Sequence, residues 1–247
     1  MPAPAPTHLT VLVTGASSGI GRAVALRLAS DGHRVIGLAR NANSLRELEA
    51  KAGIVPLAAD VTDLAGVADT LRSHEPDVVI HNAGLLSTRG PFQAIEPAAI
   101  DTHLDVNLRA PLHLTRLVLP GMIERRRGHV VFVTSIAARA AHPDIALYAT
   151  TKAALAHFSD SLRLDLQGTG IRVTDLAPGR VRTDLYRDAL TETGRKQLYE
   201  GFRSLEPEDV AAAVSYVLSL PPHVDVARLE LYPTEQAHGG SRMVSPG

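Results

Sequence analysis

The chain contains no cysteine, and its charges of opposite sign nearly cancel, with 25 lysines and arginines against 26 aspartates and glutamates. Without cysteine it can form no disulfide and has no thiol for catalysis. The lack of disulfides suits a reducing compartment, so we expect a cytoplasmic protein. The net charge of −1 provides no electrostatic reason to expect binding to nucleic acid or to an anionic membrane.

Long hydrophobic runs are also absent. No apolar run approaches the ~20 residues that span a bilayer, so we expect no membrane partner. Residues 1–6 are rich in proline and have neither a basic start nor a hydrophobic block, which argues against a secretion signal. No long linker divides the chain, and its 247 residues are enough for one sizeable core. We expect a single domain, with a loose arm over about 1–7 and a loose tail over about 238–247.

The apolar pattern alternates between short β-branched runs and longer amphipathic runs. The short runs predict strands at 8–14, 34–39, 55–59, 77–81, 129–134, 171–176 and 228–232. The longer runs predict helices at 22–30, 44–51, 64–73, 145–166 and 206–220, and a long helix within 95–126 that passes through Asn107. Such alternation is typical of a parallel sheet with helices on both faces. We therefore expect an α/β fold around a mainly parallel, seven-stranded sheet.

A glycine-rich loop follows the first predicted strand and leads into the first predicted helix. Gly15, Gly19 and Gly21 permit a tight turn and a close approach of the backbone to a ligand. The helix N-terminus that follows presents free N–H groups and the positive end of the helix dipole, which together favour phosphate. An ordinary turn is the alternative for such a loop alone, but its place between strand and helix favours a dinucleotide site.

Tyr148 and Lys152 lie about one turn apart on the predicted helix at 145–166, so their side chains share one face. A phenol is a poor acid or base at neutral pH, because its pKa is ~10. A neighbouring ammonium stabilises the phenolate and lowers that pKa towards the working pH, as general acid–base catalysis requires. A chance pair on a surface helix is the alternative interpretation of these two residues.

Further candidate residues directly follow predicted strands, namely 82–84, Ser135 and 178–179. Ligands of parallel α/β sheets bind outside the carboxyl ends of the strands, so these residues should meet the glycine loop at one edge. Taken singly, Ser135 is also explained as a residue that caps a loop. Asn107 is also explained as a buried amide that satisfies an irregular helix.

Together these motifs resemble the short-chain dehydrogenase/reductase family in its compact single-domain form. The resemblance extends from about residue 9 to residue 233 and implies a Rossmann-like, doubly wound fold. The residues that match the family's catalytic tetrad are Asn107, Ser135, Tyr148 and Lys152. Those that match its cofactor-binding positions are Gly15, Ser17, Ser18, Gly19, Ile20, Gly21, Asp60, Val61, Asn82, Ala83, Gly84, Tyr148, Lys152, Pro178, Gly179, Val181 and Thr183. His81 departs from the family, which commonly has asparagine there, and this puts a sheet-bracing hydrogen bond in doubt.

The resemblance implies hydride transfer between a nicotinamide and a carbonyl–alcohol pair, with no metal. Tyr148 would act as the general acid or base, and Lys152 would lower its pKa and bind the nicotinamide ribose. Ser135 would donate a hydrogen bond to the substrate oxygen. Asn107 would mark a helix irregularity that frees a carbonyl to hold a proton-relay water beside Lys152.

The end of the second predicted strand indicates which nicotinamide is used. NAD-preferring Rossmann proteins place a carboxylate there to bind the adenosine ribose hydroxyls. Here Ala39 and Arg40 occupy this place, with no acid before Glu47. A guanidinium binds a 2′-phosphate with charge-assisted hydrogen bonds, and the Ser17 hydroxyl would add to them. We expect NADP(H), with NAD(H) as the alternative. A solvated residue before the next helix is the other interpretation of Arg40.

Three alternatives to an NADP(H)-dependent carbonyl or alcohol oxidoreductase stay open. One is an NAD-preferring alcohol or hydroxy-acid dehydrogenase; residues 231–236 resemble the tail of the hydroxy-acid and serine dehydrogenases of the family. Another is an epimerase that transfers a hydride only transiently. The third is a non-catalytic dinucleotide-binding regulator, which we would expect to lack some of the catalytic residues present here.

The expected substrate is a small carbonyl or alcohol compound that the sequence does not identify. Its pocket should be formed by the segment 183–205, with help from 85–92 and 136–142. His142 is either a substrate contact or a solvated loop histidine. Arg139, Arg180 and Arg182 either meet an anionic substrate or carry surface charge.

Assembly is predicted from the family and from the helix at 145–166. The family forms tetramers through the helices that carry Asn107 and Tyr148. In this chain the helix has apolar residues on several faces, which favours burial between its own sheet and a partner. These residues include Leu155, Phe158, Leu162, Leu164 and Leu166. We expect a homo-oligomer, most simply a homotetramer.

Overall fold

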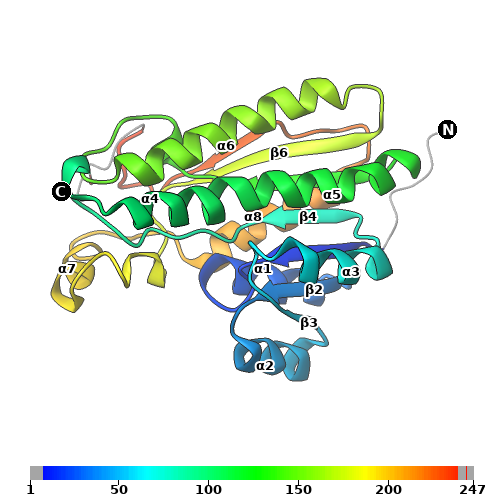
Figure 1. Ribbon diagram of the computed structural model, residues 1–247, viewed down its shortest axis with the longest axis horizontal. Coiled ribbons are helices and arrows are strands. Elements are labelled where there is room, and N and C mark those ends of the chain that lie inside the picture. Colours follow the sequence, from blue (N-terminus) through cyan, green and yellow to red (C-terminus); the bar gives the residue numbers. More distant parts are fainter. Residues whose placement is uncertain (1–7, 239–242, 244–247) are drawn as a thin grey trace.

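The computed structural model describes residues 8–238 and residue 243, and its centre is one parallel sheet of seven strands (Figure 1). The strands lie in the order β3-β2-β1-β4-β5-β6-β7. Their bounds are β1 Thr10–Thr14, β2 Arg34–Ala39, β3 Val55–Ala58, β4 Val78–His81, β5 Gly128–Val133, β6 Ile171–Pro178 and β7 Arg228–Leu231. The strand order reverses between β1 and β4, which places the switch point of this doubly wound sheet beside the glycine-rich loop. The predicted fold class is confirmed.

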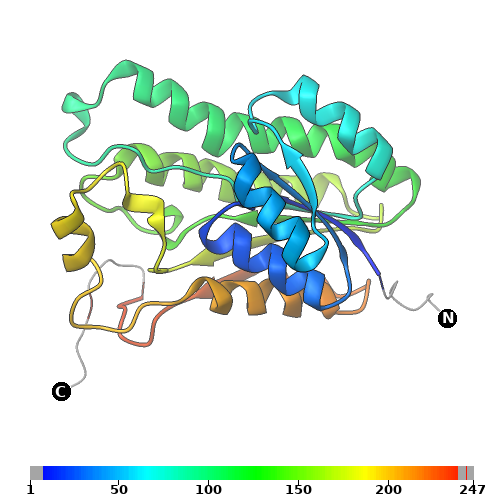
Figure 2. The ribbon, with the colours of Figure 1, turned by 90° about the horizontal axis from the view of Figure 1, so that it is seen from below.

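Helices cover both faces of the sheet. The α-helices are α1 Gly19–Ser30, α2 Ala42–Ala52, α3 Leu64–His74, α4 Pro97–Leu104, α5 Ala110–Glu124, α6 Ala146–Asp165, α7 Glu192–Gln197 and α8 Pro207–Ser219. Helices α1, α2 and α8 pack on one face, where α1 and α8 lie side by side (Figure 2). Helices α3, α5 and α6 pack on the other face. Short helical turns η1 Phe92–Ala94, η3 Ile136–Ala138 and η4 Asp184–Tyr186 lie in the loops.

The two hydrophobic cores follow from the alternation of side chains along the central strands. In β1, Val11 and Val13 enter the core under α1, whereas Leu12 enters the core under α5. All three side chains are fully buried. Strands buried on both faces are nearly continuous apolar runs, which is why they were recognisable in the sequence.

The long helical segment through Asn107 is not one regular helix. A π-helical turn, η2 Asp105–Arg109, joins α4 to α5, with Asn107 inside it. The expected irregularity at Asn107 is therefore present. Such turns leave the regular hydrogen-bond ladder locally and are frequent at functional sites.

In the sequence, the basic run 125–127 followed by Gly128 has the pattern of a helix C-terminus with a glycine cap, but the structure differs. Helix α5 ends at Glu124, and Arg126 takes the left-handed conformation with φ of 50°. Gly128 instead begins β5, where a Cβ atom would lie 2.7 Å from the Met122 sulfur. Arg127 binds the Asp77 carboxylate at 2.7 Å. Tight packing against Met122, and not helix termination, accounts for the glycine.

The end regions are described only in part. The expected arm over 1–7 and most of the expected tail lie outside the described residues. Within the tail, Met243 forms an antiparallel bridge with Gln236. No helix in the described residues is long and apolar enough to cross a membrane.

Candidate active site

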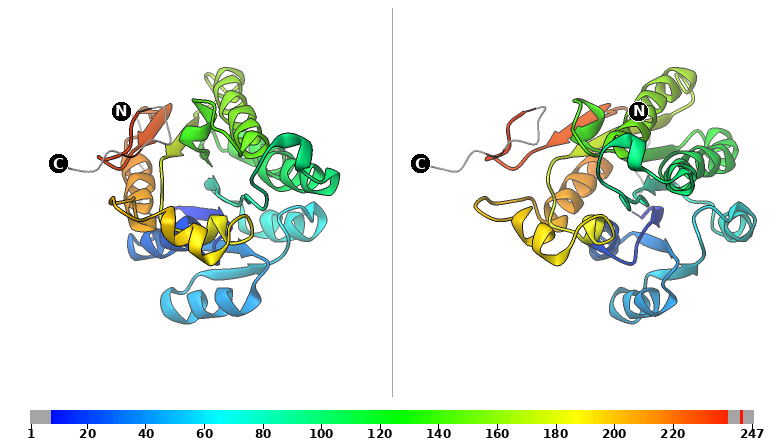
Figure 3. Two further views of the ribbon diagram at one scale, coloured as in Figure 1. Left: turned by 90° about the vertical axis from the view of Figure 1, so that its left-hand side faces the viewer. Right: turned by 60° about the vertical axis from the view of Figure 1, so that its left-hand side comes forward.

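A cavity of about 410 Å³ opens at the carboxyl edge of the sheet. Loops that follow β1, β2, β3, β4, β5 and β6 all contribute to its wall. The left view of Figure 3 looks onto this edge, with the yellow segment that contains α7 in front of the sheet. The cavity therefore lies where the topology of an open parallel sheet places ligands.

The glycine loop forms one wall by close backbone packing. Gly15 has a φ of 70°, a conformation that side chains other than glycine rarely adopt. At Gly21 a Cβ atom would lie 2.3 Å from the Gly15 carbonyl oxygen, so only glycine fits. Asn82 fixes this loop to β4, because its Nδ2 atom donates to the Thr14 carbonyl oxygen at 3.0 Å. The Thr14 hydroxyl in turn accepts hydrogen bonds from the Asn82 and Ala83 amides.

Helix α1 begins without a side-chain cap. Ser18 holds the N-cap position in extended geometry, yet no described side chain accepts from the first turn. Helix α2, by contrast, is capped by Asn41 and α3 by Asp63. The first-turn N–H groups of α1 therefore face the cavity without a side-chain cap, as an anion site requires.

Arg40 and Asp60 lie at the far end of the cavity, after β2 and β3. The Arg40 side chain is 81% exposed, and its Nη1 atom is 4.0 Å from Asp60 Oδ2. At that distance and exposure the pair constrains Arg40 little. The Thr62 amide and hydroxyl both donate to Asp60, and with the charge of Arg40 they lower the pKa of its carboxyl. Arg40 is thus free to move towards a bound anion.

Asn107 links the loop after β4 to α6. Its Oδ1 atom accepts from the Leu85 amide at 2.8 Å, and its Nδ2 atom donates to the Leu85 carbonyl oxygen at 2.9 Å. Nδ2 also lies 3.2 Å from the Thr151 hydroxyl, which donates to the Tyr148 carbonyl oxygen. Asn107 is fully buried and does not line the cavity. Its amide side chain is therefore saturated by protein, and its role is to position its neighbours.

Lys152 is buried on α6 beneath the cavity. Its Nζ atom donates to the Val133 carbonyl oxygen at 2.9 Å and lies 5.8 Å from the centre of the Tyr148 ring. Burial lowers the pKa of Lys152 to about 8, while the Asp175 carboxylate opposes this shift. The Lys152 ammonium therefore loses its proton at a pH only slightly above neutral.

Tyr148 lies between Ser135, Lys152 and Tyr186. Burial raises the pKa of Tyr148, and nearby Tyr186 adds to the increase, while a hydrogen bond with the Ser135 side chain opposes it. Burial is the largest of these effects, and the expected lowering of this pKa by Lys152 stays a prediction. Tyr148 is therefore protonated at neutral pH and ready to donate. Ser135 is also a local cap, since its hydroxyl accepts from the Ala137 amide at 3.1 Å.

The structure places nearly all of the predicted site residues around one cavity. Ser135, Tyr148 and Lys152 line it together with all of the predicted cofactor-binding residues except Gly21, which lies directly behind Gly15. The set gathered there is Gly15, Ser17, Ser18, Gly19, Ile20, Arg40, Asp60, Val61, Asn82, Ala83, Gly84, Pro178, Gly179, Val181 and Thr183. Residues more than 160 positions apart in the chain thus meet at a single site.

The comparison that decides the family is a match to the short chain dehydrogenase family over residues 9–193. The chain belongs to the short-chain dehydrogenase/reductase family. As a member of this family it is an oxidoreductase.

Relatives cover nearly its whole length. A short-chain type dehydrogenase/reductase of Sinorhizobium fredii is 48% identical over 94% of both chains. Serine 3-dehydrogenase of Rhizobium radiobacter is 36% identical over 94% of this chain and 96% of its own. A solved structure, the closed form of serine dehydrogenase complexed with NADP+, has a TM-score of 0.91 at 34% identity, covering 94% of this chain and 98% of its own.

His81 shows how this short-chain dehydrogenase/reductase replaces the asparagine that is common in the family. The imidazole is 2% exposed, stacks on Phe132 and lies with Nε2 2.9 Å from the Thr115 hydroxyl. Burial lowers the pKa of His81 to about 3, so the ring is neutral. A link between β4 and α5 thus replaces the hydrogen bond that the sequence left in doubt.

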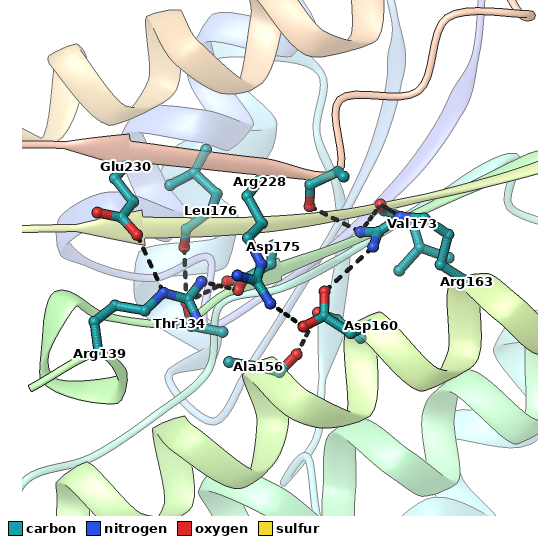
Figure 4. Close-up of polar contacts among 12 residues, drawn as sticks. Thr134, Arg139, Ala156, Asp160, Arg163, Val173, Asp175, Leu176, Arg228 and Glu230 are labelled. Carbon is teal, nitrogen blue, oxygen red and sulfur yellow. Dashed lines mark hydrogen bonds and ion pairs between the residues drawn. The ribbon is translucent and has the colours of Figure 1, made fainter.

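Arg139 corrects another expectation, since it neither faces substrate nor carries surface charge. Figure 4 shows its guanidinium between the carboxylates of Asp175 and Glu230. Asp175 is fully buried and also accepts from the Thr134 hydroxyl. This ion-pair cluster ties η3, and with it the loop of Ser135, to β6 and β7. Arg182 is also accounted for, because it pairs with Glu206 at 3.3 Å.

Two residues of the short-chain dehydrogenase/reductase site carried no signal in the sequence. Tyr186, on η4, lies close enough to Tyr148 to raise its pKa. Thr151 links Asn107 to the Tyr148 backbone. Tyr186 falls inside the segment 183–205 that was expected to form the substrate pocket, but only the tertiary fold singles it out.

Proposed function

We propose that this protein is an NADP(H)-dependent oxidoreductase that transfers a hydride between the nicotinamide and a small carbonyl or secondary alcohol, with Tyr148 as general acid or base. The observation that carries the proposal is the shared cavity: Ser135, Tyr148 and Lys152 line the same space as the glycine loop. A proton donor beside a dinucleotide site is what carbonyl reduction requires.

The residues present fit a dinucleotide. The uncapped start of α1 suits its pyrophosphate, and Gly21 leaves the backbone of the loop clear for close approach. Asp60 and Val61 stand at the adenine end, and the segment 178–183 lies at the nicotinamide end, by family resemblance. When bound, the cofactor supplies the hydride; every other requirement falls to the protein.

The protein manages the proton. Tyr148, held protonated by burial, gives its hydroxyl proton to the substrate oxygen as negative charge develops there. Ser135 donates a second hydrogen bond to the same oxygen. Lys152 stabilises the tyrosinate that results and binds ribose hydroxyls, and a water held beside the π-helical turn of Asn107 returns a proton.

The same burial bears on the direction of reaction. Oxidation of an alcohol must begin from tyrosinate, whose formation burial opposes. Reduction begins from the neutral phenol that burial favours. Near neutral pH the site therefore starts in the protonation state that carbonyl reduction requires.

The proposed preference for NADP(H) rests on Arg40. This residue directly follows β2, at the place where an NAD-preferring protein has an acid. Relatives named NADP-dependent 3-hydroxy acid dehydrogenase, such as that of Salmonella typhi at 35% identity, support the choice. Replacing Arg40 with alanine should raise the KM for NADPH by about 10-fold or more and change that for NADH little, because one charge-assisted hydrogen bond pair is lost. A wild-type enzyme with the higher kcat/KM for NADH would contradict this assignment.

The direct test of function is the stoichiometry of turnover over a panel of ketones, aldehydes and oxo acids. We expect one NADPH oxidised for each alcohol formed. An epimerase would convert its substrate with no net change in cofactor, and a non-catalytic regulator would bind NADPH without consuming it. Either result would overturn the proposal.

A further inference from the structure

Arg180 differs from the two other arginines that the sequence offered as anion contacts. Arg139 and Arg182 are occupied by carboxylates, whereas no ion pair joins Arg180 to any acidic side chain within the described residues. Its Nη1 atom donates to the Leu198 carbonyl oxygen at 2.9 Å, and its guanidinium lies 5.6 Å from the centre of the Phe202 ring. The side chain is thus held in place while its charge is left unneutralised.

Arg180 shares its cavity with the proposed proton donor. Arg180 lines the cavity together with Tyr148, His142 and Tyr186. Its positive charge lowers the pKa of His142, after the larger effect of burial, and opposes the increase that burial causes at Tyr186. Tyr186 in turn acts on Tyr148. Arg180 and Tyr148 therefore line one cavity, and Tyr186 interacts with both of them.

His142 adds a second feature that lacks a partner. Its Nε2 atom is buried and has no hydrogen-bond partner within the described residues. A buried polar atom without a partner is unfavourable, and a ligand that hydrogen-bonds to it would recover that free energy. The imidazole of His142 and the guanidinium of Arg180 together form what we call the polar corner of the cavity.

The charges around this corner favour an anion. Arg89 also acts on Tyr186, and its nearest carboxylate, that of Asp144, is 4.0 Å away. Two acids line the cavity nearby: Asp188, which is paired with Arg187 at 3.5 Å, and Asp184. Of the two guanidinium groups that act on Tyr186, that of Arg180 has no carboxylate partner in the described residues and that of Arg89 has one only at 4.0 Å.

We propose that Arg180, assisted by His142, binds a carboxylate of the substrate while Tyr148 donates a proton to the carbonyl oxygen. A guanidinium presents paired N–H donors that match the two oxygens of a carboxylate, and the unpartnered imidazole nitrogen supplies a further hydrogen bond when it carries the proton. The substrate class is then a short oxo or hydroxy acid. This inference rests on the proposed function, since it concerns the substrate end of the same site.

The test compares oxo acids with their methyl esters, which keep the reacting carbonyl and lose the negative charge. With NADPH, wild-type enzyme should reduce at least one of 2-oxobutanoate, 3-oxobutanoate and 4-oxopentanoate with a kcat/KM at least about 10-fold above that of its ester. Arg180→Met should lower kcat/KM for that acid by about 10–100-fold and leave the ester within about 2-fold. His142→Phe should lower the acid's value by a smaller factor.

The matched control is Arg228→Met, which removes an arginine that is already paired with Asp160 and does not line the cavity, and should change the rate with neither substrate. Arg180→Lys keeps the charge and should retain part of the preference if the methionine variant does not fold. A parallel loss for acid and ester would show that Arg180 only supports the segment of Leu198 and Phe202, and would overturn the inference. Equal wild-type rates for acid and ester would also overturn it. Failure of wild-type enzyme to oxidise NADPH with any carbonyl would instead refute the proposed function.

Discussion

The buried surroundings of Lys152 disfavour its positive charge. Lys152 is only 4% exposed, and its pKa of about 8 reflects burial that Asp175 compensates in part. In the unfolded chain a lysine has a pKa of ~10.4. Between these two values the unfolded chain binds a proton that the folded protein does not, so stability must rise with pH in that window. Below about pH 8 the folded protein bears the full cost of the buried ammonium.

This linkage predicts a pH-dependent difference between wild-type protein and Lys152→Met. From about pH 7.5 to 10, the free energy of unfolding of the wild type should rise relative to the variant by about 2–3 kcal/mol. Urea unfolding of the two cofactor-free proteins across this range measures the difference, and the variant cancels contributions from other groups. A difference that does not change with pH would show that the Lys152 pKa is not lowered.

At the residue scale the sequence identified the chemical groups but not their energetics. The spacing of Tyr148 and Lys152 predicted that they share a helix face, because that depends only on helical periodicity. The direction of the Tyr148 pKa shift depends on burial and on the electrostatic effect of Tyr186, which is distant in the chain. Arg139 and Arg180 looked alike in the sequence, yet the first is enclosed by Asp175 and Glu230 and the second is not. Ion pairs across strands β6 and β7 have no local signal.

Among the elements, η3 is positioned by the ion-pair cluster that Figure 4 displays. Arg139 reaches from just after η3 to Asp175 on β6 and Glu230 on β7. Since Asp175 is fully buried, removal of its partner leaves an uncompensated charge in the interior. The position of Ser135, at the start of η3, depends on this anchor.

We predict that Arg139→Leu lowers the free energy of unfolding by about 3–5 kcal/mol, the usual cost of breaking a buried pair. Arg228→Leu is the matched control, because Arg228 pairs with Asp160 where both side chains are partly exposed. Its cost should be about 1 kcal/mol or less. Chemical denaturation measures both. Equal losses in the two variants would contradict the structural role assigned to Arg139.

The sequence predicted the elements well where a single rule decides them. Local composition predicts the strands that are buried on both faces. It also predicts α8, which has Pro207 and two acids in its first turn. The short helix α7 was missed because its six residues lack an apolar period. Gly128 has the sequence pattern of a helix cap, because its close packing on Met122 leaves no local sign in the sequence. Single-domain organisation stays a prediction.

For the whole molecule, the outer face of α6 bears on assembly. Leu155, Leu162 and Leu166 pack into this chain's own core, so they need no partner. Leu164, however, is 65% exposed, and α6 forms an outer layer of the molecule beside α5 (Figure 1). An exposed leucine on an outer helix is compatible with the expected contact between copies. The homotetramer itself stays a prediction.

Light scattering at micromolar concentration should therefore give the mass of a tetramer. Leu164→Asp should shift the population towards smaller species, because it places a charge in the predicted contact. Arg116→Asp, an exposed change on α5, tests whether that helix contributes to the same contact. A monomeric wild-type protein would contradict the prediction.

The central claim is that Tyr148 donates the proton to the substrate oxygen during reduction by NADPH. Tyr148→Phe removes only the hydroxyl, so the thermal midpoint and the Kd for NADPH should stay close to those of the wild type. The decisive measurement is kcat for NADPH oxidation with a carbonyl that the wild type reduces. We predict a fall of about 10²–10⁴-fold, the usual contribution of general acid–base catalysis. A kcat within a few-fold of the wild type, in a variant that binds NADPH normally, would contradict the account.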